Sequence, residues 1–305
     1  MKNNLERRRQ QGFTLIEMSI VIGLIVGGVL VGQDLIKAAE IRATVTQLER
    51  YNTAATTFYN KYNALPGDMN AQTATALGFA ARGQYAGEGD GNGVLQGVWE
   101  NISGNAGGVQ ESAGETVMFW VDLSKAGFIE GGFNAASSTI AVTFSGSQVS
   151  QVFPQAKVGQ GNYIYAYSGW WWNGSSWVTD GTNYFGLSAV TTNNYEYGLI
   201  TSSPGLTVQQ AFMIDQKIDD GFPQSGRVLA KYNTNYAGNP SGVTTAWAGT
   251  TISGQTPYTT ATPGSSTTCF DNGDSTGATQ QYSTEQSGGT GMDCALTFVM
   301  QGAAR

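Results

Sequence analysis

Residues 13–32 form an apolar run that carries a single charged side chain, Glu17. As a helix this run would be about 30 Å long, which matches the hydrocarbon core of a bilayer. The first twelve residues hold four cations and one anion, a net charge of +3, and such a basic flank stays in the cytoplasm. The run is too long for a secretory signal, and no small-residue cleavage site follows it. The sequence therefore predicts one membrane-spanning helix near the N-terminus.

Glu17 needs an explanation, because an ionisable group in a membrane helix costs a few kcal/mol unless something pairs with it. A cut after Gly12 would create a free α-amino group on Phe13. That cation would lie about one helical turn from the Glu17 of a neighbouring chain. Glu17 then gains a partner only if several chains pack side by side, whereas an uncut anchor leaves it unpaired.

The stretch Gly12-Phe-Thr-Leu-Ile-Glu17, followed by the apolar run, resembles the class III signal of type IV prepilins and type II secretion pseudopilins. The resemblance covers roughly residues 1–60. It implies that a prepilin peptidase cuts between Gly12 and Phe13, that Phe13 is N-methylated, and that Glu17 pairs with a neighbouring N-terminus during filament assembly. One departure is that many family members carry a proline in the mature helix, where this chain reads Val-Gly-Gln-Asp-Leu.

The amino-acid composition disfavours several classes of function. The 305 residues carry a net charge of −7, only 12% of them are charged, and 42 are glycine. This balance is typical of a loop-rich extracytoplasmic protein and disfavours nucleic acid as a partner. The chain has no histidine, which excludes Ser-His-Asp and Cys-His catalysis and removes the commonest transition-metal ligand. No spacing of acids singles out a glycosidase pair. We therefore expect no enzyme.

The helical pattern continues past the membrane segment. Apolar and small residues from Ile41 to Tyr62 recur every three or four positions, and the pattern stops at Asn63-Ala-Leu-Pro66-Gly67. The predicted organisation is a leader over 1–12, a membrane or filament-core helix over 13–33, an amphipathic helix over 34–63 and a globular head over 64–305. The expected fold is α+β, a pilin-like lollipop in which the long helix packs on a head with an antiparallel sheet.

Within the head, Ser112-Ala-Gly-Glu115 reads as a capping box that opens a helix through Ala126, and Thr207 opens a second helix over 207–218. Strands are expected at 139–144, 162–168, 184–190, 195–200, 227–231 and 294–300. The stretch 248–292 is rich in Gly, Ser, Thr and Gln and is expected to be a long surface loop.

The chain has two cysteines, Cys269 and Cys294. In an oxidising compartment two such residues indicate one disulfide, and the alternative is two free buried thiols. A disulfide here would tie a polar loop to the edge of the sheet. This arrangement resembles that of pilins, which have a disulfide-bounded C-terminal region.

Glu88-Gly-Asp90-Gly-Asn92-Gly alternates oxygen ligands with glycines, like the start of an EF-hand loop. The twelfth position is Trp99, and Glu100 stands one residue late, so the stretch is not an EF-hand. We expect no required cofactor, with Glu88, Asp90 and Asn92 as candidate ligands of a structural Ca²⁺. The alternative is a plain acidic turn. Asp215, Asp219 and Asp220 are read as a helix end and a turn.

Four tryptophans, Trp170, Trp171, Trp172 and Trp177, surround an Asn-Gly pair that predicts a hairpin. Because indoles fall on both faces, they are a candidate surface for sugar binding, adhesion or a filament contact. The alternative is cross-strand aromatic packing.

The interpretation that accounts for Glu17 is a structural filament subunit, a pilin or pseudopilin. A head this large favours a minor subunit. Its expected partners are the prepilin peptidase/N-methyltransferase, identical or related pilin subunits, the inner-membrane assembly machinery and membrane lipid. The precursor would lie in the inner membrane with its head in the periplasm, before joining a periplasmic or extracellular filament. The alternative is a membrane-anchored extracytoplasmic binding or adhesion protein that uses the tryptophan hairpin.

Overall fold

The structure is a computed structural model that describes residues 14–83, 87–98, 112–139, 142–172, 177–193, 200–235, 243–248, 269–271 and 279–302. For residues 170–172, 177–179, 234–235, 243–247 and 286–287 only the backbone is described. The chain divides into two compact units, Met1–Glu40 and Ile41–Arg305. The boundary falls inside one helix, so each unit is described separately.

The first unit is the N-terminal part of helix α1, which runs over Leu15–Tyr62 for 48 residues. Up to Ile36 its large apolar side chains are exposed on every side. Among the described residues, α1 is the one helix that is long and apolar enough to cross a membrane. The helix ends within one residue of the predicted position, because Asn63 leaves the helical region at a φ of 52° and a proline follows.

The second unit begins with the remainder of α1, which buries one stripe, formed by Ile41, Thr44, Leu48, Ala55 and Phe58. The steps of three, four and seven residues place this stripe on a single face. Tyr51 packs edge-on against Trp120 of helix α4 (Glu115–Lys125), with ring centroids 5.0 Å apart. The predicted amphipathic pattern is therefore confirmed over this half.

A five-stranded antiparallel sheet forms the centre of the head, in the order β1-β2-β9-β4, with β3 also paired to β2. The strands are β1 (Asn162–Trp172), β2 (Trp177–Asn193), β3 (Ile200–Ser203), β4 (Val228–Leu229) and β9 (Leu296–Val299). Tyr165 of β1 faces Gly186 of β2, and a Cβ at Gly186 would overlap the Tyr165 ring. The glycine is thus required for this aromatic ring to lie across the sheet.

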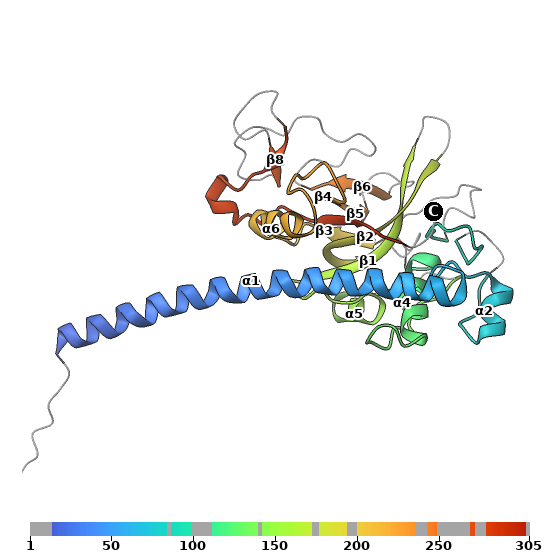
Figure 1. Cartoon of the computed structure of the whole chain (residues 1–305), viewed down its shortest axis with the longest axis horizontal. Helices are drawn as coiled ribbons and strands as arrows, with labels where there is room; N and C mark the ends of the chain where they lie inside the picture. The colour runs from blue at the N-terminus through green and yellow to red at the C-terminus, as the bar shows by residue number, and fades with distance from the viewer. Residues whose placement is uncertain are drawn as a thin grey trace, which may run out of the picture. The chain divides into compact units, whose positions relative to one another are not determined.

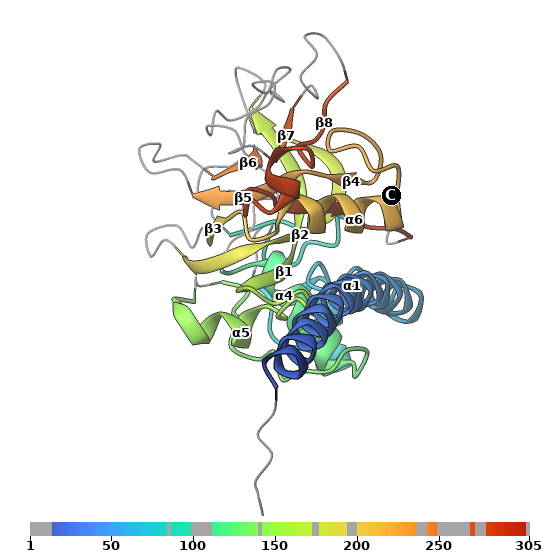
Figure 2. The ribbon, with the colours of Figure 1, turned by 90° about the vertical axis from the view of Figure 1, so that its left-hand side faces the viewer.

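Helices α4 and α5 (Val149–Val152) contact β1 and β2, and they lie on the same side of the sheet as the second half of α1 (Figures 1 and 2). Helix α6 (Val208–Ile218) contacts β4 and β8. Smaller elements complete the head. They are α2 (Ala71–Leu77), a 3₁₀ turn over Gly146–Gln148, β5 (Lys231–Asn235), β6 (Val243–Trp247), β7 (Phe270–Asp271), β8 (Gln281–Tyr282) and a 3₁₀ turn over Gln286–Gly289. The fold is α+β with an antiparallel sheet, as expected.

Three local predictions are wrong. The Ser112–Glu115 capping box does not form: α4 starts after Gly114 without a side-chain cap, because the Glu115 carboxylate is used elsewhere. Residues 142–144 do not form a strand, and 140–141 lie outside the described residues. The stretch 248–292 is more than a surface loop, since its described parts include the paired strands β7 and β8 and buried residues such as Phe270.

Candidate functional site: an N-terminal helix and a carboxylate cluster

Glu17 lies in the first turn of α1 and is exposed. Its Oε2 atom accepts hydrogen bonds from the backbone nitrogen and the hydroxyl of Thr14, both at 2.8 Å. Thr14 therefore gives the carboxylate a neutral partner within its own chain, which sequence reasoning missed. Gly12 and Phe13 lie outside the described residues, so their roles in cleavage and methylation stay predictions.

Fourteen large apolar side chains between Leu15 and Ile36 are exposed. At Gly23, Gly27, Gly28 and Gly32 an added Cβ would meet nothing within 4 Å. A helix that is apolar on every face is stable only in lipid or against other helices. This part of α1 is thus suited to those two environments.

A second candidate site lies in the head. Asp68, Asp90 and Glu115 each offer a carboxylate oxygen, and these oxygens all lie within 4.8 Å of one another. Asp68 follows the end of α1, Asp90 belongs to the turn 87–96, and Glu115 is the first residue of α4. We call these three residues the carboxylate cluster. Among the described residues no lysine or arginine forms an ion pair with them.

Backbone amides of the turn 87–96 point at two of these acids. Glu115, which is completely buried, accepts hydrogen bonds from the nitrogens of Gly89 at 3.0 Å and Gln96 at 2.9 Å. Asp68 accepts from the nitrogens of Gly91 and Gly93, both at 2.7 Å. The turn thus wraps around carboxylates that come from distant parts of the sequence.

Asn183 of β2 holds the same turn from the sheet side. Its Oδ1 accepts from the nitrogen of Leu95, and its Nδ2 donates to the carbonyl of Gly93, each at 2.9 Å. Because both contacts are to backbone atoms, they fix the path of the turn whatever side chains it carries. The carboxylate cluster is therefore anchored to the sheet.

Burial raises the pKa of Asp68 to about 7, and the backbone donors Gly93 and Gly91 only partly oppose this. Burial also raises the pKa of Glu115 well above its usual range, and the negative charges of Asp68 and Asp90 add to the effect. Three acids this close cannot all stay charged without compensation. Their oxygens can share protons or ligate a hard cation such as Ca²⁺.

The predicted calcium ligands divide as follows. Asp90 belongs to the carboxylate cluster, whereas Glu88 is buried and is not among its three members. Asn92 is next to the cluster: its Nδ2 donates to Asp90, and its Oδ1 accepts from the nitrogen of Val94. Sequence reasoning missed Asp68 and Glu115, because only folding brings them next to the turn.

A buried ion pair supports the neighbouring backbone. Arg82 donates to Oδ2 of Asp122, and neither side chain is exposed. The same oxygen accepts from the nitrogen of Gly67 at 2.7 Å. Gly67 has a φ of 88° and no room for a Cβ, because Glu115 of α4 lies against it. This contact fixes the start of α4 beside the segment that carries Asp68.

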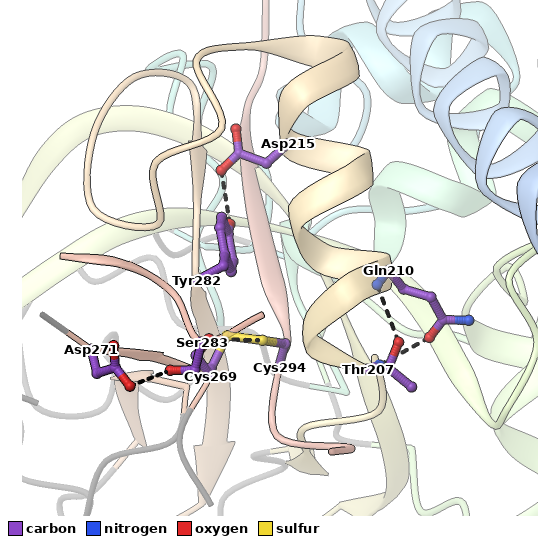
Figure 3. The surroundings of a disulfide bond; sticks show 8 residues. All are labelled: Thr207, Gln210, Asp215, Cys269, Asp271, Tyr282, Ser283 and Cys294. Atoms are coloured by element: carbon purple, nitrogen blue, oxygen red, sulfur yellow. Dashed lines mark hydrogen bonds between the residues drawn. A yellow bond between two sulfur atoms is a disulfide. The ribbon is translucent and has the colours of Figure 1, made fainter. Parts of the chain in front are cut away.

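The C-terminal region is joined by a disulfide between Cys269 and Cys294, with Cα atoms 4.9 Å apart, as predicted (Figure 3). Beside it, the Tyr282 hydroxyl donates to Asp215 of α6, and Ser283 donates to Asp271, each at 2.8 Å. Thr207 caps α6 with Gln210, in the predicted capping position. The disulfide and these bonds join β7, β8 and α6 into one packed region.

Asp215, Asp219 and Asp220 also lie close together. Asp215 accepts from Tyr282 and the nitrogen of Gly221, and Asp220 accepts from Ser225 and the nitrogen of Phe222. Because these oxygens satisfy the end of α6 and the turn after it, the group fits the predicted helix end and turn.

Of the tryptophan hairpin, the structure describes only the backbone of residues 170–172 and 177–179. Trp172 pairs with Trp177, Trp171 with Val178 and Trp170 with Thr179. The side chains of residues 170–179 lie outside the described part of the chain, so the binding surface stays a prediction.

Comparison with known proteins identifies one motif. Residues 7–31 match the model for the prokaryotic N-terminal methylation motif, which is the type IV prepilin-type signature. No curated protein and no solved structure matches the chain. The motif covers the three arginines of the basic flank, Gly12, Phe13, Glu17 and most of the apolar run, and it does not reach the head.

Proposed function

We propose that this prepilin-type chain is a structural subunit, a pilin or pseudopilin, of a type IV pilus-like filament. A prepilin peptidase would cut it after Gly12 and methylate Phe13, and subunits would assemble through α1. The proposal rests on two features that lie in the same segment of the chain. The methylation motif at residues 7–31 lies on a helix whose apolar side chains, from Leu15 to Ile36, are exposed on all sides.

The exposed apolar side chains of α1 show how much free energy their burial would release. Burying one large aliphatic side chain is worth about 1.5–3 kcal/mol, so fourteen of them amount to at least roughly 20 kcal/mol. Water cannot be the environment of this helix. Lipid would hold it in the precursor, and neighbouring helices would replace the lipid in a filament.

Glu17 would determine how neighbouring subunits pack during assembly. Thr14 supplies hydrogen bonds but no charge, and no cation among the described residues pairs with the carboxylate. The α-amino group of a cleaved Phe13 on a neighbouring subunit would provide that cation. The pair would form only at one stagger between two helices, and it would therefore select the correct packing of subunits.

Cleavage, methylation and filament assembly each require a partner. We expect the prepilin peptidase/N-methyltransferase, identical or related subunits, and the inner-membrane assembly machinery. The precursor would have its N-terminus in the cytoplasm and its head in the periplasm. The size of the head favours a minor or specialised subunit.

The variant Glu17→Gln tests the proposal, because a glutamine oxygen can still accept from Thr14 while the charge is lost. In a host with an active prepilin peptidase, we expect the protein to stay in the membrane with Phe13 methylated but absent from sheared filaments. Glu49→Gln, an exposed position in the second half of α1, is the matched control and should assemble normally. Normal filament yield from Glu17→Gln would refute the charge pairing.

One observation favours the alternative of a binding protein with an uncut anchor. Thr14 already satisfies hydrogen-bonding atoms of Glu17, so this acid is less isolated than the sequence suggests. Mass spectrometry of the N-terminus separates the two functions. Methylated Phe13 supports the filament subunit, and an intact Met1–Gly12 segment in a native host supports the anchor.

We also propose that a structural Ca²⁺ is held in the head, by Asp68, Asp90 and Glu115. Its support is that Asp68 and Glu115 are buried beside the exposed Asp90, and that none of the three forms an ion pair among the described residues, since Ca²⁺ prefers carboxylate oxygens. Thermal unfolding of the full-length protein in detergent, with Ca²⁺, with Mg²⁺ or with EDTA, tests this. Ca²⁺ should raise the melting temperature by several degrees, and Asp90→Asn should reduce that gain. An identical melting temperature in all three conditions would refute the site.

A further inference from the structure

A cavity of about 470 Å³ opens where α1 ends. Its walls come from the last turn of α1, from α2 and from the turn 87–96, and they include Tyr59, Tyr62, Asn63, Thr73 and Asn92. This volume lies within the range of small-molecule sites. Asp68 also lines the cavity, which therefore shares one member with the carboxylate cluster, while its other lining residues are different.

Two tyrosines supply its aromatic wall. Tyr59 and Tyr62 are three residues apart on α1 and so share a face. Tyr62 is fixed by Phe58 and Phe79, with ring centroids 4.6 and 5.1 Å away, and Lys61 covers its ring at 4.9 Å. Tyr59 is half-buried and packs in part against the hydrophobic core, and among the described residues its ring and hydroxyl make no aromatic contact or hydrogen bond. The exposed part of the Tyr59 ring is thus the aromatic surface left for a ligand.

The polar groups around these rings are neutral amides and hydroxyls. Asn63 is exposed and held at a φ of 52°, Asn92 is exposed on the glycine turn, and Thr73 is half-exposed on α2. Among the residues that the structure describes, no lysine or arginine lines the cavity, and the one charged residue that does is the acid Asp68. A phosphate or carboxylate ligand would therefore meet one acidic side chain and no basic side chain of these lining residues. The walls suit a ligand that is uncharged and rich in hydroxyl groups.

We propose that this cavity binds a neutral saccharide. One sugar ring would stack on Tyr59, because the C–H face of a pyranose matches an aromatic face while its hydroxyls stay polar. The hydroxyls would exchange hydrogen bonds with Asn63 and Thr73. This function is a recognition role for the head. It uses none of the tryptophans and does not depend on filament assembly.

Saturation-transfer NMR on the full-length protein in detergent tests the proposal, with glucose, galactose, N-acetylglucosamine and maltose as probes. At least one should show saturation transfer with millimolar affinity. Tyr59→Leu keeps the apolar packing and removes the ring, and it should weaken binding about tenfold or more. Its melting temperature shows whether the fold is kept.

Two threonines of α2 provide a matched pair that leaves the core intact. Thr73 lines the cavity, whereas Thr75 lies on the same helix and does not. Thr73→Ala should weaken binding of the same sugar several-fold, and Thr75→Ala should not change it. The proposal is overturned if none of the four sugars gives saturation transfer. It is equally overturned if Thr73→Ala and Thr75→Ala bind alike. Neither result bears on the Glu17 assembly test.

Discussion

The two halves of α1 have the same secondary structure and opposite surroundings. From Leu15 to Ile36 the apolar side chains surround the helix and are exposed, whereas from Ile41 to Tyr62 they form one buried stripe beside polar positions. The backbone is helical in both halves, so helix propensity does not set this difference. The distribution of apolar residues around the axis does, and it assigns lipid or other helices to one half and a sheet to the other.

The largest expected effect tests this division directly. Phe58 is 0% exposed and lies in a cluster of aromatic rings, so Phe58→Ala should cost about 3–5 kcal/mol. Val26→Ala, in the exposed half, should change head stability by less than about 0.5 kcal/mol. Thermal unfolding in detergent, followed by near-ultraviolet circular dichroism, measures both. Equal losses for the two variants would mean that the halves do not differ in burial.

The next largest effect is that a change of pH should alter the stability of the head but not that of the first half of α1. The pKa of Asp68 in the folded head is about 7, above its ordinary value near 3.8, so folding favours the protonated acid. Stability should then fall as pH rises from about 4 to about 7, and level off above that range. Asp215, whose pKa burial also raises to about 7, adds to the same trend.

In EDTA, we therefore expect the melting temperature of the head to be several degrees lower at pH 8 than at pH 5. The far-ultraviolet helical signal that survives head unfolding in detergent, assigned to the first half of α1, should not follow this change. A melting temperature that rises with pH over this range would contradict the raised pKa of Asp68.

The smallest effect concerns a polar residue in the buried half. Gln47 donates through Nε2 to the carbonyl of Gln155 and accepts through Oε1 from the nitrogen of Lys157, both at 2.9 Å. Gln47→Ala should cost about 1–2 kcal/mol, because two backbone groups lose their partner. Thr53→Ala, an exposed position on the same helix, is the control. Urea unfolding that cannot separate the two variants would show that Gln47 does not hold the head to α1.

The same contrast explains what the sequence could predict. Period and composition are local properties, so they located the ends of α1 and α6 and several strands of the sheet. Glu115 shows the limit: its neighbours in sequence suggest a helix cap, yet its oxygens accept from Gly89 and Gln96 in a turn nineteen or more residues away. Asp68 was missed as a candidate ligand for the same reason. Cys269 and Cys294 could be paired because the chain has only two cysteines.

The buried half of α1 also has a mechanical consequence. Near its start Gln47 is bonded to the segment 155–157, and near its end Asn52 and Thr56 are bonded to Gln301. Tension applied along the helix axis would load these bonds and the apolar stripe in parallel, as shear. Tension applied across the axis would peel them away one turn at a time. A head attached in this way resists a pull along α1 far better than one from the side.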